Sequence, residues 1–110
     1  MSLNNENEFV NWEDITNMDQ NLLRGIYSYG FDNPSVIQQK SIIPFINGSD
    51  IIAQAQSGTG KTGSFSIGTI NRINIEEKTS QALIISPTRE LSIQTKKVVD
   101  SLSCMMKHLI

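Results

Sequence analysis

Apolar residues recur along this chain at two different spacings, which predict helices in some segments and strands in others. Between residues 20 and 29 they recur every three or four positions, the period of a helix with one buried face. The inward positions are Leu22, Leu23, Ile26 and Tyr27. Asp19 can cap the start of this segment and Gly30 can end it, so we expect a first helix between them.

A second helix is expected from Ser35 to about Ile42. Asn33 and Pro34 before it have the pattern of a cap followed by a proline in the first turn. Pro44 lacks the N–H that a helix interior requires, so it should separate this helix from a short one ending at Gly48.

Two short apolar runs, Asp50–Gln54 and Gln81–Ser86, are predicted to be buried strands. The second stops at Pro87, whose missing N–H cannot continue a strand ladder. A helical pattern follows each run, from Lys61 to about Ile73 and from Thr88 onward. Strands that alternate with helices indicate an α/β fold with a parallel sheet.

The segment between the first strand and its helix, Ala55–Thr62, reads AQSGTGKT. Glycines let the main chain approach closely with several N–H groups pointing inward, and the ammonium group of Lys61 would reach the phosphates. The hydroxyl of Thr62 would ligate Mg²⁺, and the following helix N-terminus favours anions. The segment therefore predicts a phosphate-binding loop made of Gln56, Ser57, Gly58, Thr59, Gly60, Lys61 and Thr62. A plain surface turn would explain the glycines but not the Lys-Thr pair.

Gln38 is a candidate for recognising a nucleotide base. Its amide can accept and donate side by side, as adenine recognition through N6 and N7 requires. Phe31 offers a ring on which a base could stack. The alternative is a solvated helical glutamine and a phenylalanine of the core.

Pro87, Thr88 and Arg89 follow the second predicted strand, at the end of a sheet where ligands bind in open α/β folds. Thr88 and the first N–H groups of its helix could hold a nucleic-acid phosphate, with Arg89 adding a charge. Alternatively, Thr88 is only an N-cap, followed by a first-turn acid, Glu90.

Composition narrows the class of protein. The chain has 110 residues, a net charge of −2 and 38% hydrophobic residues, which suits one small domain and argues against bulk electrostatic binding to nucleic acid. No apolar run approaches the ~20 residues that cross a bilayer. One cysteine, Cys104, excludes an internal disulfide, so we expect an intracellular protein with Cys104 in its core and His108 incidental. Residues 1–11 are expected to be a disordered polar tail, and residues 12–110 a single domain.

Three stretches, in this order, resemble the DEAD-box family of ATP-dependent RNA helicases. The stretch Gly30-Phe31-x-x-Pro34-x-x-Ile37-Gln38 is similar to the Q motif of that family. Ala55–Thr62 is similar to its motif I, AxxGxGKT, in which alanine stands where many phosphate loops have glycine. Pro87–Leu91 is similar to its motif Ia, PTREL. The resemblance covers roughly residues 12 to 106.

This resemblance implies the first part of a RecA-like ATP-binding domain that binds ATP, Mg²⁺ and RNA and opens short RNA duplexes. Phe31, Pro34 and Gln38 would surround the adenine, Lys61 and Thr62 would act on the phosphates and Mg²⁺, and Pro87, Thr88 and Arg89 would face RNA. Implied partners are initiation-factor or exon-junction proteins, in the cytoplasm or nucleus.

The sequence contains no Asp-Glu-Ala-Asp string, no SAT motif and no second domain. Phosphoryl transfer depends on charged groups that these parts supply, so the chain alone is expected to be catalytically incomplete. A nucleotide-binding or protein-interaction module without catalysis is the alternative. We also expect unpaired strand edges that make the isolated chain marginally stable.

Overall fold

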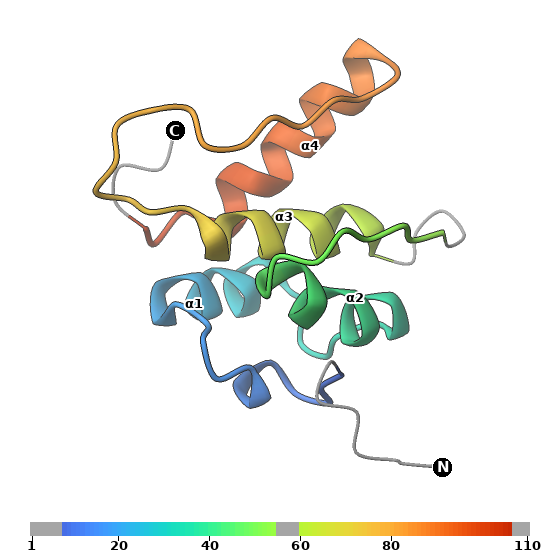
Figure 1. Ribbon diagram of the computed structural model, residues 1–110, viewed down its shortest axis with the longest axis vertical. Helices are drawn as coiled ribbons and strands as arrows, with labels where there is room; N and C mark the ends of the chain where they lie inside the picture. The colour runs from blue at the N-terminus through green and yellow to red at the C-terminus, as the bar shows by residue number, and fades with distance from the viewer. Residues whose placement is uncertain (1–7, 55–59, 107–110) are drawn as a thin grey trace.

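The computed structural model describes residues 8–54 and 60–106 of the chain. Within them lie one 3-10 turn and four α-helices: η1 (Trp12–Asp14), α1 (Gln20–Tyr29), α2 (Val36–Ile46), α3 (Lys61–Arg72) and α4 (Arg89–Leu102). Helix α3 lies in the middle, with α1 and α2 on one side and α4 on the other (Figure 1). The predicted phosphate loop therefore lies immediately before the central helix in the sequence.

Local capping residues set both ends of α1, as the sequence predicts. The Asp19 carboxylate accepts hydrogen bonds from the backbone N–H groups of Asn21 and Leu22, at 2.7 and 3.3 Å. Gly30 ends the helix at φ 105°, a left-handed conformation that glycine adopts without a Cβ penalty. The predicted first helix is confirmed.

Two expectations for α2 are wrong. The cap is Ser35 rather than Asn33, because the Ser35 hydroxyl accepts from the Gln38 N–H while the Gln38 side chain accepts from the Ser35 N–H. Pro44 does not separate two helices, since α2 continues through it to Ile46. One lost hydrogen bond near a helix end is tolerated when neighbouring turns are packed, and α2 packs along α3.

The core forms where η1 and the four helices meet. Its fully covered side chains include Trp12, Leu22, Ile26, Ile42, Ile67 and Leu102, each 0% exposed. Phe9 also belongs to this core, at 5% exposure, with its ring 5.5 Å from that of Trp12. The packed part of the chain therefore begins before residue 12, earlier than the sequence suggested.

The two expected strands do not form in the described part of the chain. Residues 51–54 and 81–86 are extended but carry no strand ladder. Ile52, Leu83 and Ile85 are 102%, 83% and 84% exposed, so these segments are not buried either. Strand structure requires a neighbouring strand to exchange hydrogen bonds, and the described residues offer none to either segment.

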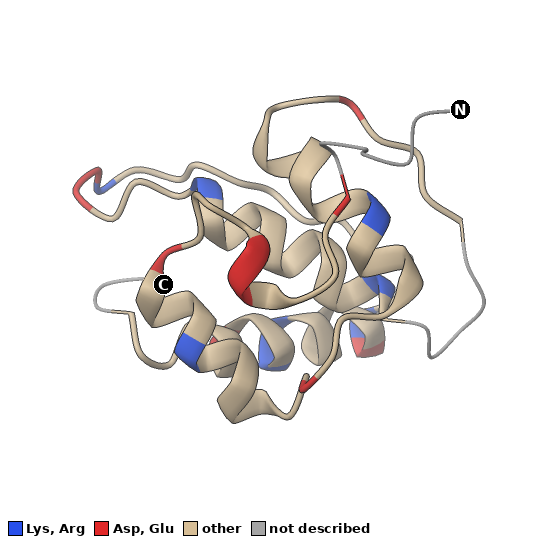
Figure 2. Ribbon diagram, turned by 90° about the horizontal axis from the view of Figure 1, so that it is seen from below, with Lys and Arg blue, Asp and Glu red and all other residues tan. Residues whose placement is uncertain are grey.

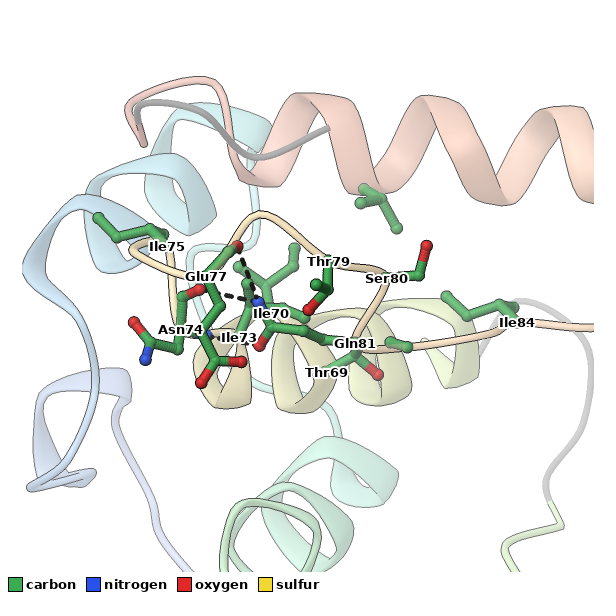
Figure 3. A pocket seen from close by; sticks show the side chains of 12 residues that line it. Thr69, Ile70, Ile73, Asn74, Ile75, Glu77, Thr79, Ser80, Gln81 and Ile84 are labelled. Atoms are coloured by element: carbon green, nitrogen blue, oxygen red, sulfur yellow. Dashed lines mark hydrogen bonds between the residues drawn. The ribbon is translucent and has the colours of Figure 1, made fainter.

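The connection from α3 to the second extended segment is a polar surface loop, as expected. Gln81 closes it: its amide accepts from the Asn74 N–H at 2.9 Å and donates to the Asn74 carbonyl at 2.8 Å. Figure 3 shows these contacts beside a small pocket of about 240 Å³ between the loop and α3. Gln81 thus holds the loop closed by hydrogen bonds to Asn74 and does not begin a strand.

The last helix, α4, buries few of its residues. Thr95 and Leu102 are buried, whereas Leu91 is 43% exposed. Cys104, just past the helix, is exposed, so its expected place in the core is wrong. The helix ends at Leu102 and the chain turns there, which takes Cys104 off the helical face that its spacing suggested.

Candidate functional site

The predicted phosphate-binding loop ends in the first turn of α3. Gly60 immediately precedes the helix at φ 92° and ψ 19°, a left-handed conformation that favours glycine. Lys61 and Thr62 are the first two helical residues, and both are half-buried. The first N–H groups of a helix have no intrahelical partner, so this end attracts anions. Gln56, Ser57, Gly58 and Thr59 lie outside the described residues.

Gln38 lies against this helix start. Its amide nitrogen donates to the Gly60 carbonyl at 3.3 Å, and its amide oxygen accepts from the Ser35 N–H at 2.9 Å. The side chain is 2% exposed, so it is not a solvated helical glutamine. The candidate base-recognition residue and the end of the candidate phosphate loop are therefore in direct contact.

Phe31 approaches the same place from the turn before α2. Its ring and the Gln38 amide nitrogen both lie within 3.0 Å of the point that a Cβ on Gly63 would occupy. The Phe31 carbonyl accepts a hydrogen bond of 2.8 Å from the indole of Trp12, which is fully buried. Trp12 thus fixes the turn that carries Phe31. Pro34, in the same turn, is buried.

A cavity of about 510 Å³ opens at the start of α3. Lys61, Thr62 and Ser64 line it together with Pro87, and apolar residues of α2, of the two segments without strand structure and of α4 complete its wall. Gln38 and Phe31 do not line it. Two of the predicted groups, the loop lysine and the segment at Pro87, therefore border one space, and the third group is not part of its lining.

Thr88 and Arg89 are exposed at the start of α4. The Thr88 hydroxyl accepts from the Leu91 N–H at 3.2 Å, so its capping role is confirmed. Exposure leaves both residues accessible to a ligand, and their expected contact with RNA stays a prediction.

Two residues of the site were not singled out from the sequence. Ser35 completes a capping box with Gln38, and the spacing Ser-x-x-Gln is the known signal for that motif. Ser64 is 6% exposed, and its hydroxyl has no hydrogen-bond partner in the described structure. No sequence signal distinguishes Ser64 from other small helical residues.

Charge is spread over the molecule. Lys, Arg, Asp and Glu residues lie on several elements in Figure 2 rather than in one basic surface. Among the residues that the structure describes, no group of His, Cys, Asp and Glu could hold a metal ion, and no helix could span a membrane.

The amino-acid sequence is similar to those of known helicases, in agreement with the resemblance that the three motifs indicate. The chain is 61% identical over 82 residues to a protein of Trypanosoma cruzi named probable eukaryotic initiation factor 4A, covering 74% of this chain and 20% of that protein. It is 55% identical over 93 residues to the ATP-dependent RNA helicase eIF4A of Saccharomyces cerevisiae, covering 84% and 24%. The aligned part of the chain thus spans about a fifth to a quarter of the length of these relatives.

The fold is also shared with solved helicase structures. A structure of S. cerevisiae Dbp5 bound to RNA and ADP BeF3 superposes with a TM-score of 0.81 at 38% identity, over 88% of this chain and 25% of that one. The expected fold class, the first part of a RecA-like α/β domain, is that of these neighbours. The family model described as DEAD/DEAH box helicase matches residues 35–109. This chain therefore belongs to the DEAD/DEAH box helicase family.

Proposed function

We propose that the chain supplies the ATP-binding start of an ATP-dependent RNA helicase that opens short RNA duplexes. The observation that carries this proposal is the contact between Gln38 and Gly60, which joins a base-recognition amide to the end of a phosphate loop. The relatives support it, since one is named an ATP-dependent RNA helicase and a solved neighbour is bound to RNA and ADP BeF3. Translation initiation is the process that the relatives' names favour.

Each candidate residue has a role in this proposal. Lys61 holds the phosphates by charge, and Gln38 and Phe31 hold the adenine. Thr62 contributes a hydroxyl to Mg²⁺, a cation that is usually held by one or two protein ligands together with phosphates and water. Pro87, Thr88 and Arg89 contact RNA phosphates.

Nucleotide binding by the 110-residue chain tests the proposal. Lys61→Ala removes a charge-assisted contact, which contributes about 1.5–3 kcal/mol, so the affinity for a fluorescent ATP analogue should fall at least about tenfold. Lys97→Ala is the matched control, because Lys97 is exposed on α4, away from the loop. Equal affinity of both variants for ATP would refute the phosphate-binding role.

RNA contact needs a separate measurement. Arg89→Ala should weaken binding of single-stranded RNA and reduce its salt dependence, because one phosphate contact is lost. ATP affinity should stay unchanged, since Arg89 does not line the cavity beside Lys61. Unchanged RNA binding would remove Arg89 from the proposed interface.

A second candidate function is a binding module without catalysis. Such a module needs only the binding groups at the start of α3, which border a cavity of about 510 Å³. RNA-stimulated ATP hydrolysis, measured on the longest available protein that contains this chain, separates the two functions: a binding module holds nucleotide but shows no turnover at any RNA concentration. The residues at the start of α3 perform the same binding in either case.

A further inference from the structure

One buried hydroxyl near the start of α3 has no hydrogen-bond partner among the described residues, although its residue borders the cavity beside Lys61. We propose that Ser64 is a further ligand-binding residue of this site, and that its hydroxyl donates a hydrogen bond to an anionic phosphate oxygen of the nucleotide. This inference rests on the proposed ATP-binding function. It adds a contact beyond Thr62, the last residue of the phosphate-loop motif.

Other serines of this chain show where a hydroxyl on a helix normally binds. The Ser41 hydroxyl donates to the Ile37 carbonyl at 2.6 Å, and the Ser103 hydroxyl donates to the Val99 carbonyl at 2.7 Å. In both pairs the acceptor lies four residues earlier in the chain. The Val99 carbonyl also accepts from the Ser103 N–H at 3.0 Å, so both of its lone pairs are used.

Ser64 cannot bind in this way, because the carbonyl four residues before it is already saturated. That carbonyl belongs to Gly60 and accepts from the Ser64 N–H at 2.9 Å. It also accepts from the Gln38 amide nitrogen at 3.3 Å. A carbonyl oxygen has two lone pairs, so none is left for the Ser64 hydroxyl. The contact between α2 and the start of α3 therefore leaves this hydroxyl without its usual partner.

The surroundings of Ser64 favour an anion as the missing partner. Ser64 is 6% exposed, and it lines the cavity of about 510 Å³ together with Lys61 and Thr62. Residues three apart share a helix face, so Ser64 follows Lys61 along the cavity side of α3. The first N–H groups of the helix attract negative charge to the same end. A serine hydroxyl turns about one side-chain torsion, so it can meet an acceptor that enters this cavity.

An unpaired hydroxyl lowers the stability of the free protein but strengthens the complex. A buried polar group without a partner is unfavourable, and serine is also less favourable than alanine inside a helix. A phosphate oxygen would supply a charged acceptor, which makes a stronger hydrogen bond than a neutral one. Ser64 should therefore reduce stability when the site is empty and raise affinity when it is filled.

Ser64→Ala and Ser66→Ala form a matched pair that tests this role. Ser66 lies on the same helix, is 0% exposed and also has an unpartnered hydroxyl, but it does not line the cavity. Each substitution removes one such hydroxyl from α3 and puts alanine in its place. Affinities for ATP and for inorganic triphosphate, which has no base, are measured by isothermal titration calorimetry. The unfolding temperature is measured without ligand.

Both variants should unfold at the wild-type temperature or above it, because each loses an unpaired hydroxyl. Ser64→Ala should bind ATP and triphosphate about tenfold more weakly, as expected for one hydrogen bond to a charged group. Ser66→Ala should keep both affinities within about twofold of wild type, because Ser66 has no place in the cavity wall.

Four results would overturn the proposal while leaving ATP binding in place. The first is wild-type affinity in Ser64→Ala, and the second is an equal loss of affinity in both variants. The third is a loss confined to ATP, which would place the contact away from the phosphates. The fourth is a lower unfolding temperature of Ser64→Ala, which would show that the hydroxyl has a partner in the free chain. A wild-type chain that bound neither ATP nor triphosphate would instead overturn the proposed function, and this inference with it.

Discussion

Gly25 lies in the middle of α1, and replacing it by alanine tests how closely α1 packs against α4. A Cβ at this position would stand 1.9 Å from the carbonyl oxygen of Leu102, whereas ordinary contacts lie between 3.4 and 4 Å. The obstacle is a backbone atom, so no side-chain rotation can relieve it. The two helices would have to separate, although Leu22, Ile26 and Leu102 are completely buried between them.

The expected cost follows from two opposing effects. Overpacking a core costs about 1–3 kcal/mol, and the backbone obstacle places this case at the upper end. In a helix interior, alanine is also more favourable than glycine by about 1 kcal/mol of helix propensity. The free energy of unfolding should therefore fall by about 2 kcal/mol. For a chain of this size, the midpoint of urea unfolding, followed by circular dichroism at 222 nm, should fall by roughly 1.5–2 M.

Gly68→Ala in α3 is the matched control. It carries the same gain in helix propensity, but its Cβ would meet the ring of Phe45, whose nearest atom is at 2.6 Å. Phe45 borders the cavity of about 510 Å³, so its ring has room to turn away. The net change should stay within about 1 kcal/mol. If Gly25→Ala were as stable as wild type, or both variants shifted equally, the close approach of α1 and α4 would be refuted.

Four smaller changes test other contacts. Thr88→Ala should destabilise α4 by about 1 kcal/mol in urea unfolding while Thr88→Ser does not, since only the cap differs. Asn71→Ala removes two hydrogen bonds to the loop before α1, at 3.0 Å each, and should cost about 1–2 kcal/mol. The hydrogen bond to Glu13 raises the pKa of Tyr27 from 10.0 to about 12. The stability that this bond gives is therefore present below pH 10.0 and lost as the pH rises through about 12. Glu13→Gln should lower the pH at which tyrosine ionisation, followed by absorbance, reaches its midpoint. Leu83→Lys should reduce concentration-dependent association in sedimentation, because this side chain is 83% exposed; a monomeric wild-type chain that unfolds cooperatively would contradict the expected instability.

The helices could be predicted because their ends are decided locally. Asp19 and Gly30 bound α1 through hydrogen bonds and a backbone conformation that involve only nearby residues. The same holds for Gly60, Lys61 and the start of α3. The helix break predicted at Pro44 is wrong because proline tolerance depends on packing, and the local sequence pattern does not show that α2 packs against α3.

Strands and the surroundings of Gln38 depend on residues far apart in the sequence. An apolar run predicts that a segment can pair, but pairing also needs a neighbour, and the described residues give none to residues 51–54 and 81–86. The type of residue at position 38 indicated what Gln38 could bind. Its burial, and its contact with Gly60 across 22 positions, could not be read from spacing. Sequence thus predicts a chemistry for the site from residue types, whereas the environment of Gln38 depends on the fold.

The two halves of the site are held by different kinds of structure. Gln38 and Gly60 lie between helices that pack against each other, so their contact depends on the core. The cavity beside Lys61 is instead walled in part by the extended segments: Ile51 and Ala53 line it while Ile52 between them is fully exposed, an alternation typical of a strand. The side chains of residues 51–53 thus alternate as they would in a sheet, but the described residues place no strand beside them. Pairing of these segments would therefore change the phosphate side of the site through the cavity wall, while the contact between Gln38 and Gly60 would stay as it is.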